Sequence, residues 1–281
     1  MPELPEVESV RRQLEPELTS RRVTDVWWSP YPRSRLTDVE LVRGRRIMAV
    51  HRRGKFLVLP LDVTADGDDL ELVLHLGMTG SLTFAPTPPP GADPDAGVTH
   101  VRARFVLDDG RSLLFRDPRR FGRVSVVPAG DYVDRIPTLA SLGPEPLSDA
   151  FDPEEFARSL AATSATVKAR LLDQRLVAGV GNIYADEALW RARIHPASRR
   201  VGRARAHALH TAVIAVLAEA IEREGTTFRD YRMVNGESGR NAPYLAAYGQ
   251  AGEPCRRCGT PMRHTVVAQR GTTYCPRCQR G

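Results

Sequence analysis

The four cysteines of the chain all lie near its C-terminal end. They form two Cys-x2-Cys pairs, Cys255 with Cys258 and Cys275 with Cys278, which are separated by sixteen residues. This spacing is typical of a tetrahedral four-thiolate zinc site built on two knuckles and a hairpin. Two disulfides are the alternative, but no export signal is recognised in the sequence and a cytosol keeps thiols reduced. We therefore expect one structural Zn²⁺, which closes a module too small to hold its own core.

The same module is strongly basic. From Pro254 to Gly281 there are six arginines and no acidic residue. Such a single-sign tail is typical of a surface that follows phosphates, although many basic proteins bind no polyanion. The run from Thr272 to Tyr274 predicts a returning strand, which leaves Arg270 at the hairpin tip. An arginine there could reach a phosphate, or it could be plain solvated surface.

The first eight residues, MPELPEVE, allow a different chemistry. If the initiator methionine is removed, Pro2 becomes a terminal secondary amine, which can attack an aldehyde or a C1 sugar carbon and form an iminium. Glu3 stands directly beside it as an acidic partner. The alternative is that a proline and three glutamates simply open a surface helix.

The first half of the chain predicts a helix followed by a β-sandwich or barrel. A helix should begin near Pro5, because apolar residues recur at helical spacing at Val7, Val10, Leu14 and Leu18. Short strand-like runs follow between residues 23 and 127, and Asp108–Gly110 predicts a hairpin turn. Residues 86–97 are rich in proline, glycine and aspartate and predict a mobile loop.

The second half predicts helices, at residues 154–162, 167–172, 182–192 and 203–224. The fold class is therefore α+β. The composition changes around residue 145, where LGPEPLSDAFDP reads as a linker. We divide the chain into residues 1–136, a linker at 137–152, a helical domain at 153–250 and the cysteine module at 251–281.

Composition sets broader limits. A length of 281 residues with 42% hydrophobic content suits two packed domains, and the net charge of +6 makes an anionic partner plausible. No window approaches a membrane span, so we expect no membrane contact and a cytoplasmic location. Only two of the forty basic residues are lysines, Lys55 and Lys168. Base-composition bias can explain this, or both sites need a compact ammonium whose pKa can shift.

Three glycine-containing stretches hold candidate DNA contacts. Glycines 179 and 181 precede a helix at Asn182, where backbone amides suit a phosphate, although Asn182 could equally cap the helix. The motifs HLGMTG and DPRRFG place Met78, Arg119 and Phe121 at turns. These side chains could fill the hole left by a base that leaves the DNA stack, but Met78 and Phe121 taken singly are more often core residues.

Seven stretches in order resemble the formamidopyrimidine-DNA glycosylase family over essentially the whole chain: MPELPEVE, RRGKFL, HLGMTG, DPRRFG, LGPEPL, VAGVGNIYADE and CRRCGTP with VVAQRGTTYCPRCQ. The resemblance implies an N-terminal catalytic β-sandwich flanked by helices, a helix-two-turn-helix DNA-binding domain and a zinc finger. Double-stranded DNA with a damaged base would lie in the cleft between the domains. The implied activity is base-excision repair, in which 8-oxoguanine and formamidopyrimidines are excised and the strand is nicked by β,δ-elimination.

The resemblance also implies roles for single residues. Pro2 would form a Schiff base with C1′ of the damaged nucleotide, and Glu3 would assist as acid and base. Lys55 would transfer protons in β-elimination, and Arg270 in δ-elimination. The implied DNA contacts are His100, Arg119, Lys168 and Asn182, with Lys168 and Asn182 on phosphates. The residues that would fill the void in the duplex are Met78, Arg119 and Phe121.

Two departures and two alternatives accompany this resemblance. Ser164 stands where many relatives carry a phosphate-binding lysine, so we expect that contact to be weakened or lost. The loop at 235–245 lacks the bulky run common in relatives, which leaves the lesion preference open. An endonuclease VIII-like enzyme for oxidised pyrimidines is the nearest alternative, and Leu4 and the polar loop after Thr227 argue against it. A non-catalytic zinc-finger DNA-binding protein would leave MPELPEVE and Lys55 unexplained.

A chain that clamps DNA in its own cleft needs no partner subunit. We therefore expect a monomer that works in the bacterial cytosol at the nucleoid.

Overall fold

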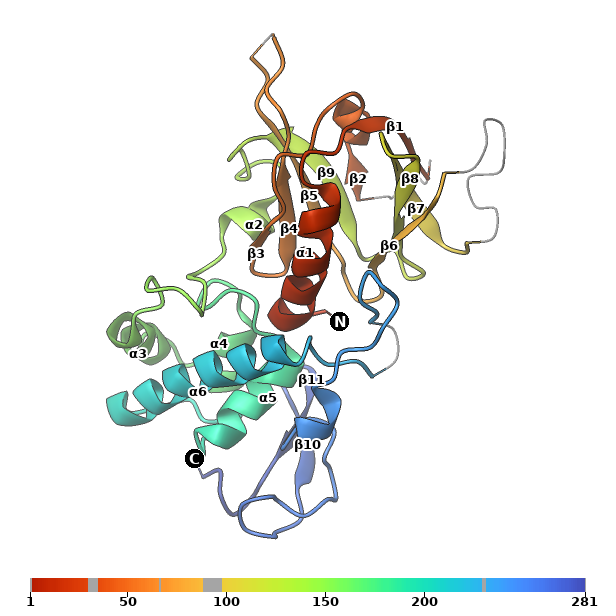
Figure 1. Ribbon diagram of the computed structural model, residues 1–281. Helices are drawn as coiled ribbons and strands as arrows, with labels where there is room; N and C mark the ends of the chain where they lie inside the picture. The colour runs from red at the N-terminus through yellow and green to blue at the C-terminus, as the bar shows by residue number, and fades with distance from the viewer. Residues whose placement is uncertain (1, 30–34, 66, 88–97, 229–230, 281) are drawn as a thin grey trace. The chain divides into compact units, whose positions relative to one another are not determined.

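The computed structural model describes residues 2–29, 35–65, 67–87, 98–228 and 231–280. The chain forms two compact units (Figure 1). The first unit contains residues 1–140 and 224–240, and the second contains residues 141–223 and 241–281. Residues 88–97 of the predicted mobile loop lie outside the described part of the chain.

The first unit is a β-sandwich. Its strands are β1 (Val23–Trp28), β2 (Leu36–Thr37), β3 (His51–Arg53), β4 (Phe56–Pro60), β5 (Leu70–His75), β6 (Ser81–Pro86), β7 (Val101–Leu107), β8 (Arg111–Arg116) and β9 (Arg123–Pro128). One sheet has the strand order β1-β7-β8-β6, and the other has the order β2-β9-β5-β4-β3. Buried side chains of both sheets share one hydrophobic cluster, so this cluster is the core of the unit. The sandwich predicted from the sequence is confirmed.

Helix α1 (Leu4–Leu18) packs against β3 and β4 (Figure 1). Glu3 is its N-cap, a capping box joins Glu3 to Glu6, and a proline occupies the first turn. These features satisfy backbone N–H groups that a helix start leaves unpaired, which is why the helix begins here. The stripe that it buries is the predicted one, Val7, Val10, Leu14 and Leu18.

The hairpin predicted at Asp108–Gly110 joins β7 to β8, which pair antiparallel. Gly110 has φ +83°, a backbone conformation that glycine adopts without steric cost. The prediction is confirmed.

Residues 224–240, called the return segment below, belong to the first unit although helices precede them in the chain. A bridge between Thr226 and Arg240 closes the base of the segment, and Arg240 also forms an ion pair with Glu224 at 3.0 Å. Three of its side chains are buried in the cluster that the two sheets share, Tyr231, Met233 and Val234. The helical domain proposed from the sequence, at 153–250, includes this segment. The periodicity of hydrophobic residues does not indicate which core an irregular segment packs into.

The second unit contains the helices α3 (Pro153–Ala161), α4 (Val167–Leu172), α5 (Asn182–Arg191) and α6 (Arg203–Glu222). Each predicted helix is present, with ends within two residues of the prediction. A short helix, α2 (Pro137–Ala140), occupies the start of the stretch read as a linker. By length and composition α6 could cross a membrane. It packs against α3 and α5 and buries much of its surface, as a core helix does.

The cysteine module forms an antiparallel hairpin of β10 (Arg263–Val267) and β11 (Arg270–Tyr274). Val267 pairs with Arg270, so Ala268 and Gln269 form the tip and Arg270 begins the returning strand. Both tip residues have positive φ angles, 50° and 59°. The predicted hairpin is confirmed, but its returning strand begins two residues earlier than predicted, so Arg270 lies beside the tip and not at it.

The burial of the return segment makes a testable prediction. Met233→Ala should lower the free energy of unfolding of the first unit by about 2–5 kcal/mol, because it leaves a cavity in the sandwich core. The chain has three tryptophans. In a Trp190→Phe background, the fluorescence of Trp27 and Trp28 therefore reports this unit in a urea titration. Leu217→Ala on α6 is the matched control and should leave that transition in place. An unchanged midpoint for Met233→Ala would contradict the assignment.

Candidate functional site

Pro2 and Glu3 are buried at the start of α1. Glu3 is only 2% exposed, and its backbone N–H donates to Oε2 of Glu6 at 2.8 Å. A helix N-terminus carries partial positive charge, which disfavours protonation of an amine placed just before it. This is the setting expected from the sequence for a nucleophile and its acidic partner. Their roles in a reaction stay predictions.

The carboxylate of Glu6 also holds the return segment. Its Oε1 accepts the backbone N–H of Thr226 at 2.6 Å, and the Glu6 carbonyl accepts the hydroxyl of Tyr231 at 3.0 Å. Gly225 has φ +80°, and a Cβ there would lie 2.7 Å from Oε1 of Glu6, so this approach requires glycine. One carboxylate therefore joins the start of α1 to the return segment. Sequence reasoning missed it because the partners lie far apart in the chain.

Lys55 lies in the turn between β3 and β4 and is 7% exposed. Arg52 joins this turn to α1, because its Nε donates to Glu8 at 3.0 Å and its Nη1 donates to the carbonyl of Gly54 at 3.1 Å. The ammonium of Lys55 lies close enough to His75 to influence the pKa of that ring.

His75, at the end of β5, is a candidate that the sequence analysis missed. Burial lowers its pKa to about 4, and the positive charges of Lys55 and Arg123 act in the same direction. The ring is therefore neutral at pH 7. Its Nδ1 accepts the N–H of Gly77 at 3.1 Å, so the ring hydrogen sits on Nε2 as a neutral donor. The available signal was a histidine that ends a strand directly before a glycine-flanked turn.

Asp117 joins the two turns that carry the predicted void-filling residues. Its Oδ1 accepts the hydroxyl of Thr79 at 2.7 Å, and its Oδ2 accepts the N–H of Gly122 at 2.7 Å. The turns also touch through their backbones. Gly77 has φ +65°, and a Cβ there would lie 2.5 Å from the carbonyl carbon of Phe121. The two motifs HLGMTG and DPRRFG therefore form one rigid structure.

The side chains of this structure are accessible. Met78 is 37% exposed and Phe121 is 43% exposed, so neither is a core residue. The guanidinium of Arg119 lies 5.0 Å from the centroid of the Phe121 ring, a cation–π distance. His100 is exposed, and its carbonyl accepts the N–H of Asp117 at 3.0 Å. The structure thus gathers His100, Met78, Arg119 and Phe121 around one buried carboxylate.

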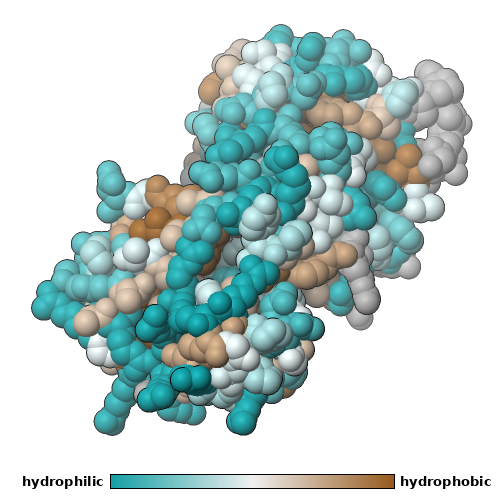
Figure 2. All heavy atoms as spheres, turned by 60° about the horizontal axis from the view of Figure 1, so that its bottom comes forward, coloured by the Kyte–Doolittle hydropathy of each residue, from teal (hydrophilic) through white to brown (hydrophobic). Residues whose placement is uncertain are grey.

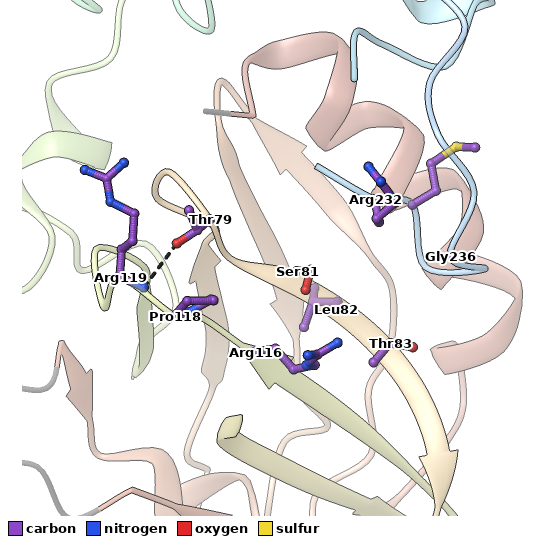
Figure 3. Close-up of a pocket in the computed structure, with 10 residues that line it drawn as sticks. Thr79, Ser81, Leu82, Thr83, Arg116, Pro118, Arg119, Arg232 and Gly236 are labelled. Carbon is purple, nitrogen blue, oxygen red and sulfur yellow. Dashed lines mark hydrogen bonds between the residues drawn. The ribbon is translucent and has the colours of Figure 1, made fainter. Parts of the chain in front are cut away.

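A cavity of about 390 Å³ lies beside these turns (Figure 3). Arg116, Arg119 and Arg232 line it, and none of the described lining residues is acidic. Figure 3 shows the hydrogen bond that the backbone N–H of Arg119 donates to the hydroxyl of Thr79, which is 3.2 Å long. A lining of arginines and hydroxyls suits an anion.

In the second unit, Lys168 is completely buried. Its Nζ donates to Oδ1 of Asp186 at 2.6 Å, to the hydroxyl of Thr272 at 2.7 Å and to the carbonyl of Gly271 at 3.2 Å. Burial raises the pKa of Asp186 to about 6, although the Lys168 charge acts in the opposite direction. The phosphate contact predicted for Lys168 would need a hydrogen that these acceptors already use.

Asn182 is the first residue of α5, and Gly181 is the N-cap. The Asn182 side chain does not cap its helix in this structure. Its Nδ2 donates to the carbonyl of Gly271 at 3.0 Å, at the base of the hairpin tip. Arg270 is exposed next to it in sequence. Asn182 and the start of β11 are therefore brought together, as a shared site requires.

Two arginines, Arg199 and Arg200, lie beside Ser164. Nη1 of Arg199 donates to the carbonyl of Ser164 at 2.8 Å. Arg199 and Arg200 line a cavity of about 660 Å³ together with Ser164 and the residues before α6. Positive charge is thus present where the sequence predicts the loss of a lysine contact.

The four cysteine sulfurs lie within 4.8 Å of one another. A tetrahedron with Zn–S bonds of about 2.3 Å has S–S edges of about 3.8 Å, so the cluster fits one zinc ion. Trp190 on α5 donates its indole N–H to Cys255 Sγ at 3.4 Å, and Gln279 accepts the N–H of Cys275 at 2.7 Å. Gln279 also donates to the carbonyl of Ile194, which docks the module on the segment that follows α5. The face of the molecule that Figure 2 shows is mostly hydrophilic, with hydrophobic residues in between.

Three family models match the chain. They are described as the formamidopyrimidine-DNA glycosylase N-terminal domain at residues 1–124, the H2TH domain of the same enzymes at 142–232, and a zinc finger found in FPG and IleRS at 252–281. The last match and the thiolate geometry agree that the four cysteines hold one structural zinc.

Named relatives match along their whole length. The formamidopyrimidine-DNA glycosylase of Thermus thermophilus is 48% identical, over 99% of this chain and 98% of its own. That of Deinococcus radiodurans is 45% identical over 99% and 97%. The crystal structure of the Thermus protein has a TM-score of 0.88 to this one. A Lactococcus lactis FPG mutant in complex with DNA that contains Fapy-dG has a TM-score of 0.86 at 34% identity and covers both chains fully.

The zinc site makes a testable prediction. Cys275→Ala removes a buried thiolate and should lower the zinc content, measured by atomic emission, from about one ion per chain towards zero. The hairpin of β10 and β11 should then lose hydrogen-exchange protection. Ser164→Ala, outside the module, is the control and should keep its zinc. Full metal content in Cys275→Ala would contradict the four-thiolate site.

Proposed function

The chain belongs to the formamidopyrimidine-DNA glycosylase family, and we infer from this that it excises oxidised purines from duplex DNA as a step of base-excision repair. The observation that carries the proposal is the buried Pro2–Glu3 pair at the positive end of α1, in a chain that matches its named relatives from end to end. A proline amine beside a carboxyl group is what Schiff-base chemistry at a sugar carbon needs.

We propose the following steps. The Pro2 amine, freed by removal of Met1, attacks C1′ of a nucleotide that has left the helix stack. The glycosidic bond and then the C1′–O4′ bond break, and an iminium remains. The departing base and the freed O4′ each take up one proton: the Glu3 carboxyl gives one, and the proton that the amine loses reaches the other through the same carboxylate. The iminium acidifies C2′, so a proton leaves C2′ and the 3′ phosphate departs. Lys55 transfers protons in that elimination. Arg270 assists the second elimination, in which the 5′ phosphate departs.

The proposed DNA contacts divide between the units. In the first unit, Met78, Arg119 and Phe121 fill the void left by the displaced base, which offsets a few kcal/mol of lost stacking. The rigidity that Asp117 gives to both turns supports this role. His100, His75 and the arginine-lined cavity offer further contacts to phosphates. In the second unit, Asn182 and Arg270 contact phosphates, and Arg199 and Arg200 supply charge beside Ser164.

For Lys168 we do not carry the phosphate contact over, because its ammonium is buried. We also propose that the protein acts as a monomer in the bacterial cytosol. Size-exclusion chromatography with light scattering should give the mass of one chain, 31.1 kDa.

Borohydride trapping tests the proposed chemistry. Protein with a Pro2 terminus confirmed by mass spectrometry should form a covalent adduct with an 8-oxoguanine or abasic duplex, and peptide mapping should place it on Pro2. The matched control carries extra N-terminal residues, which turn the Pro2 nitrogen into an amide and should abolish trapping. Absence of an adduct with the confirmed wild-type terminus on both duplexes would refute the mechanism.

Lesion choice separates this function from its nearest alternative. Single-turnover excision of 8-oxoguanine should exceed that of thymine glycol by about tenfold or more, since contacts to the extruded base decide the rate. The two duplexes should differ only in the lesion. Faster release of thymine glycol would move the chain to the endonuclease VIII-like branch.

A further inference from the structure

The ammonium of Lys168 has no hydrogen left for a ligand. A lysine ammonium carries three N–H donors. Three protein acceptors, on Asp186, Thr272 and Gly271, lie at 2.6, 2.7 and 3.2 Å from Nζ. The side chain is 0% exposed. A phosphate could reach this nitrogen only if the surrounding structure opened.

The acceptors of Lys168 come from two elements. Asp186 belongs to α5, while Gly271 and Thr272 belong to β11. Lys168 itself lies on α4, so one nitrogen joins three elements. Each of these contacts is buried or partly buried, and therefore weakly screened by salt.

Neighbouring groups hold the same short stretch of β11. Oδ2 of Asp186 accepts the N–H of Thr273 at 3.0 Å. Nδ2 of Asn182 donates to the carbonyl of Gly271 at 3.0 Å. Residues 271–273 are thus fixed at four points, and they directly follow Arg270, which is exposed.

We propose that Lys168 is a positioning residue that fixes β11 and so delivers Arg270 to the DNA, and that it does not itself bind a phosphate. The proposal rests on the proposed function, in which Arg270 assists the second elimination. The position also needs a lysine in a chain that otherwise uses arginine, because three acceptors around one nitrogen suit an ammonium. A planar guanidinium with five donors would leave several of them unpaired.

Lys168→Met and Lys168→Arg test this against a direct phosphate contact. A lost phosphate contact reduces the salt slope of DNA affinity by about 1. On a duplex with a stable abasic analogue we expect both variants to give the same slope, at most about 1 below that of the wild type, because each displaces Arg270 and its phosphate contact. We expect both to slow the second elimination, up to about 10²-fold, because a small misplacement of Arg270 suffices. A direct contact would instead be lost in Lys168→Met and kept in Lys168→Arg.

Three controls accompany the two variants. Arg270→Gln should lower the slope and block the second elimination. Arg158→Gln removes one exposed charge from α3 and should change neither. Lys168→Met/Asp186→Asn removes both buried charges, so that β11 can be studied in a folded chain if the single variant unfolds. Zinc content and circular dichroism confirm folding in each case.

The exchange rate of the Thr273 amide hydrogen measures how firmly β11 is held, independently of any role of Arg270. Exchange should be faster in the Lys168 variants than in wild type. The proposal is wrong if a folded, zinc-loaded Lys168→Met protein shows the wild-type exchange rate at Thr273 and the wild-type ratio of elimination products. It is also wrong if the salt slope of DNA affinity falls by about 1 in Lys168→Met and Lys168→Arg restores it. If Arg270→Gln leaves the products unchanged, the function proposed for Arg270 fails, while exchange at Thr273 still decides the role of Lys168.

Discussion

The carboxylate of Glu6 accepts two backbone N–H groups from opposite ends of the sequence of the first unit, those of Glu3 and Thr226. Several loops and turns of the molecule are likewise held by hydrogen bonds from backbone N–H groups to buried carboxylates. Asp117 joins two turns, Asp186 holds β11, and Glu187 accepts the successive N–H groups of residues 246–248 before the zinc module. A buried carboxylate is costly unless it is paired, and bonds to it are strong, so each loop keeps one geometry.

The regular elements were predictable because their signals are local. Helix α1 shows its apolar stripe and its capping residues within eighteen positions, and the zinc site shows its ligand spacing directly. The carboxylate contacts were not predictable in the same way. Glu6, Asp117 and Asp186 look like ordinary acidic residues in the sequence, and only the fold brings their partners to them. His75 was missed for the same reason, since its neutral state results from burial and from three cations that lie elsewhere in the chain.

The candidate site divides into exposed groups and the buried groups that place them. Met78, Phe121 and Arg270 are accessible, and each is adjacent to a turn or strand held by a buried carboxylate. Resemblance to a family identifies positions well, but it does not separate these two kinds of residue. Lys168 illustrates the difference, because the family resemblance marks it as functional while the structure shows which groups its ammonium holds. The scarcity of lysine was the one sequence signal that pointed to a special requirement there.

The path of the chain between its units has a mechanical consequence. The chain passes from one unit to the other three times, after residues 140, 223 and 240. A protease that cut once between residues 140 and 153 would produce two fragments, and the C-terminal one would carry Tyr231, Met233 and Val234, which belong to the core of the N-terminal one. Buried side chains would then hold the fragments together without a covalent link. The protein should therefore allow fragment complementation, in which residues 224–240 of the C-terminal fragment complete the core formed by residues 1–140.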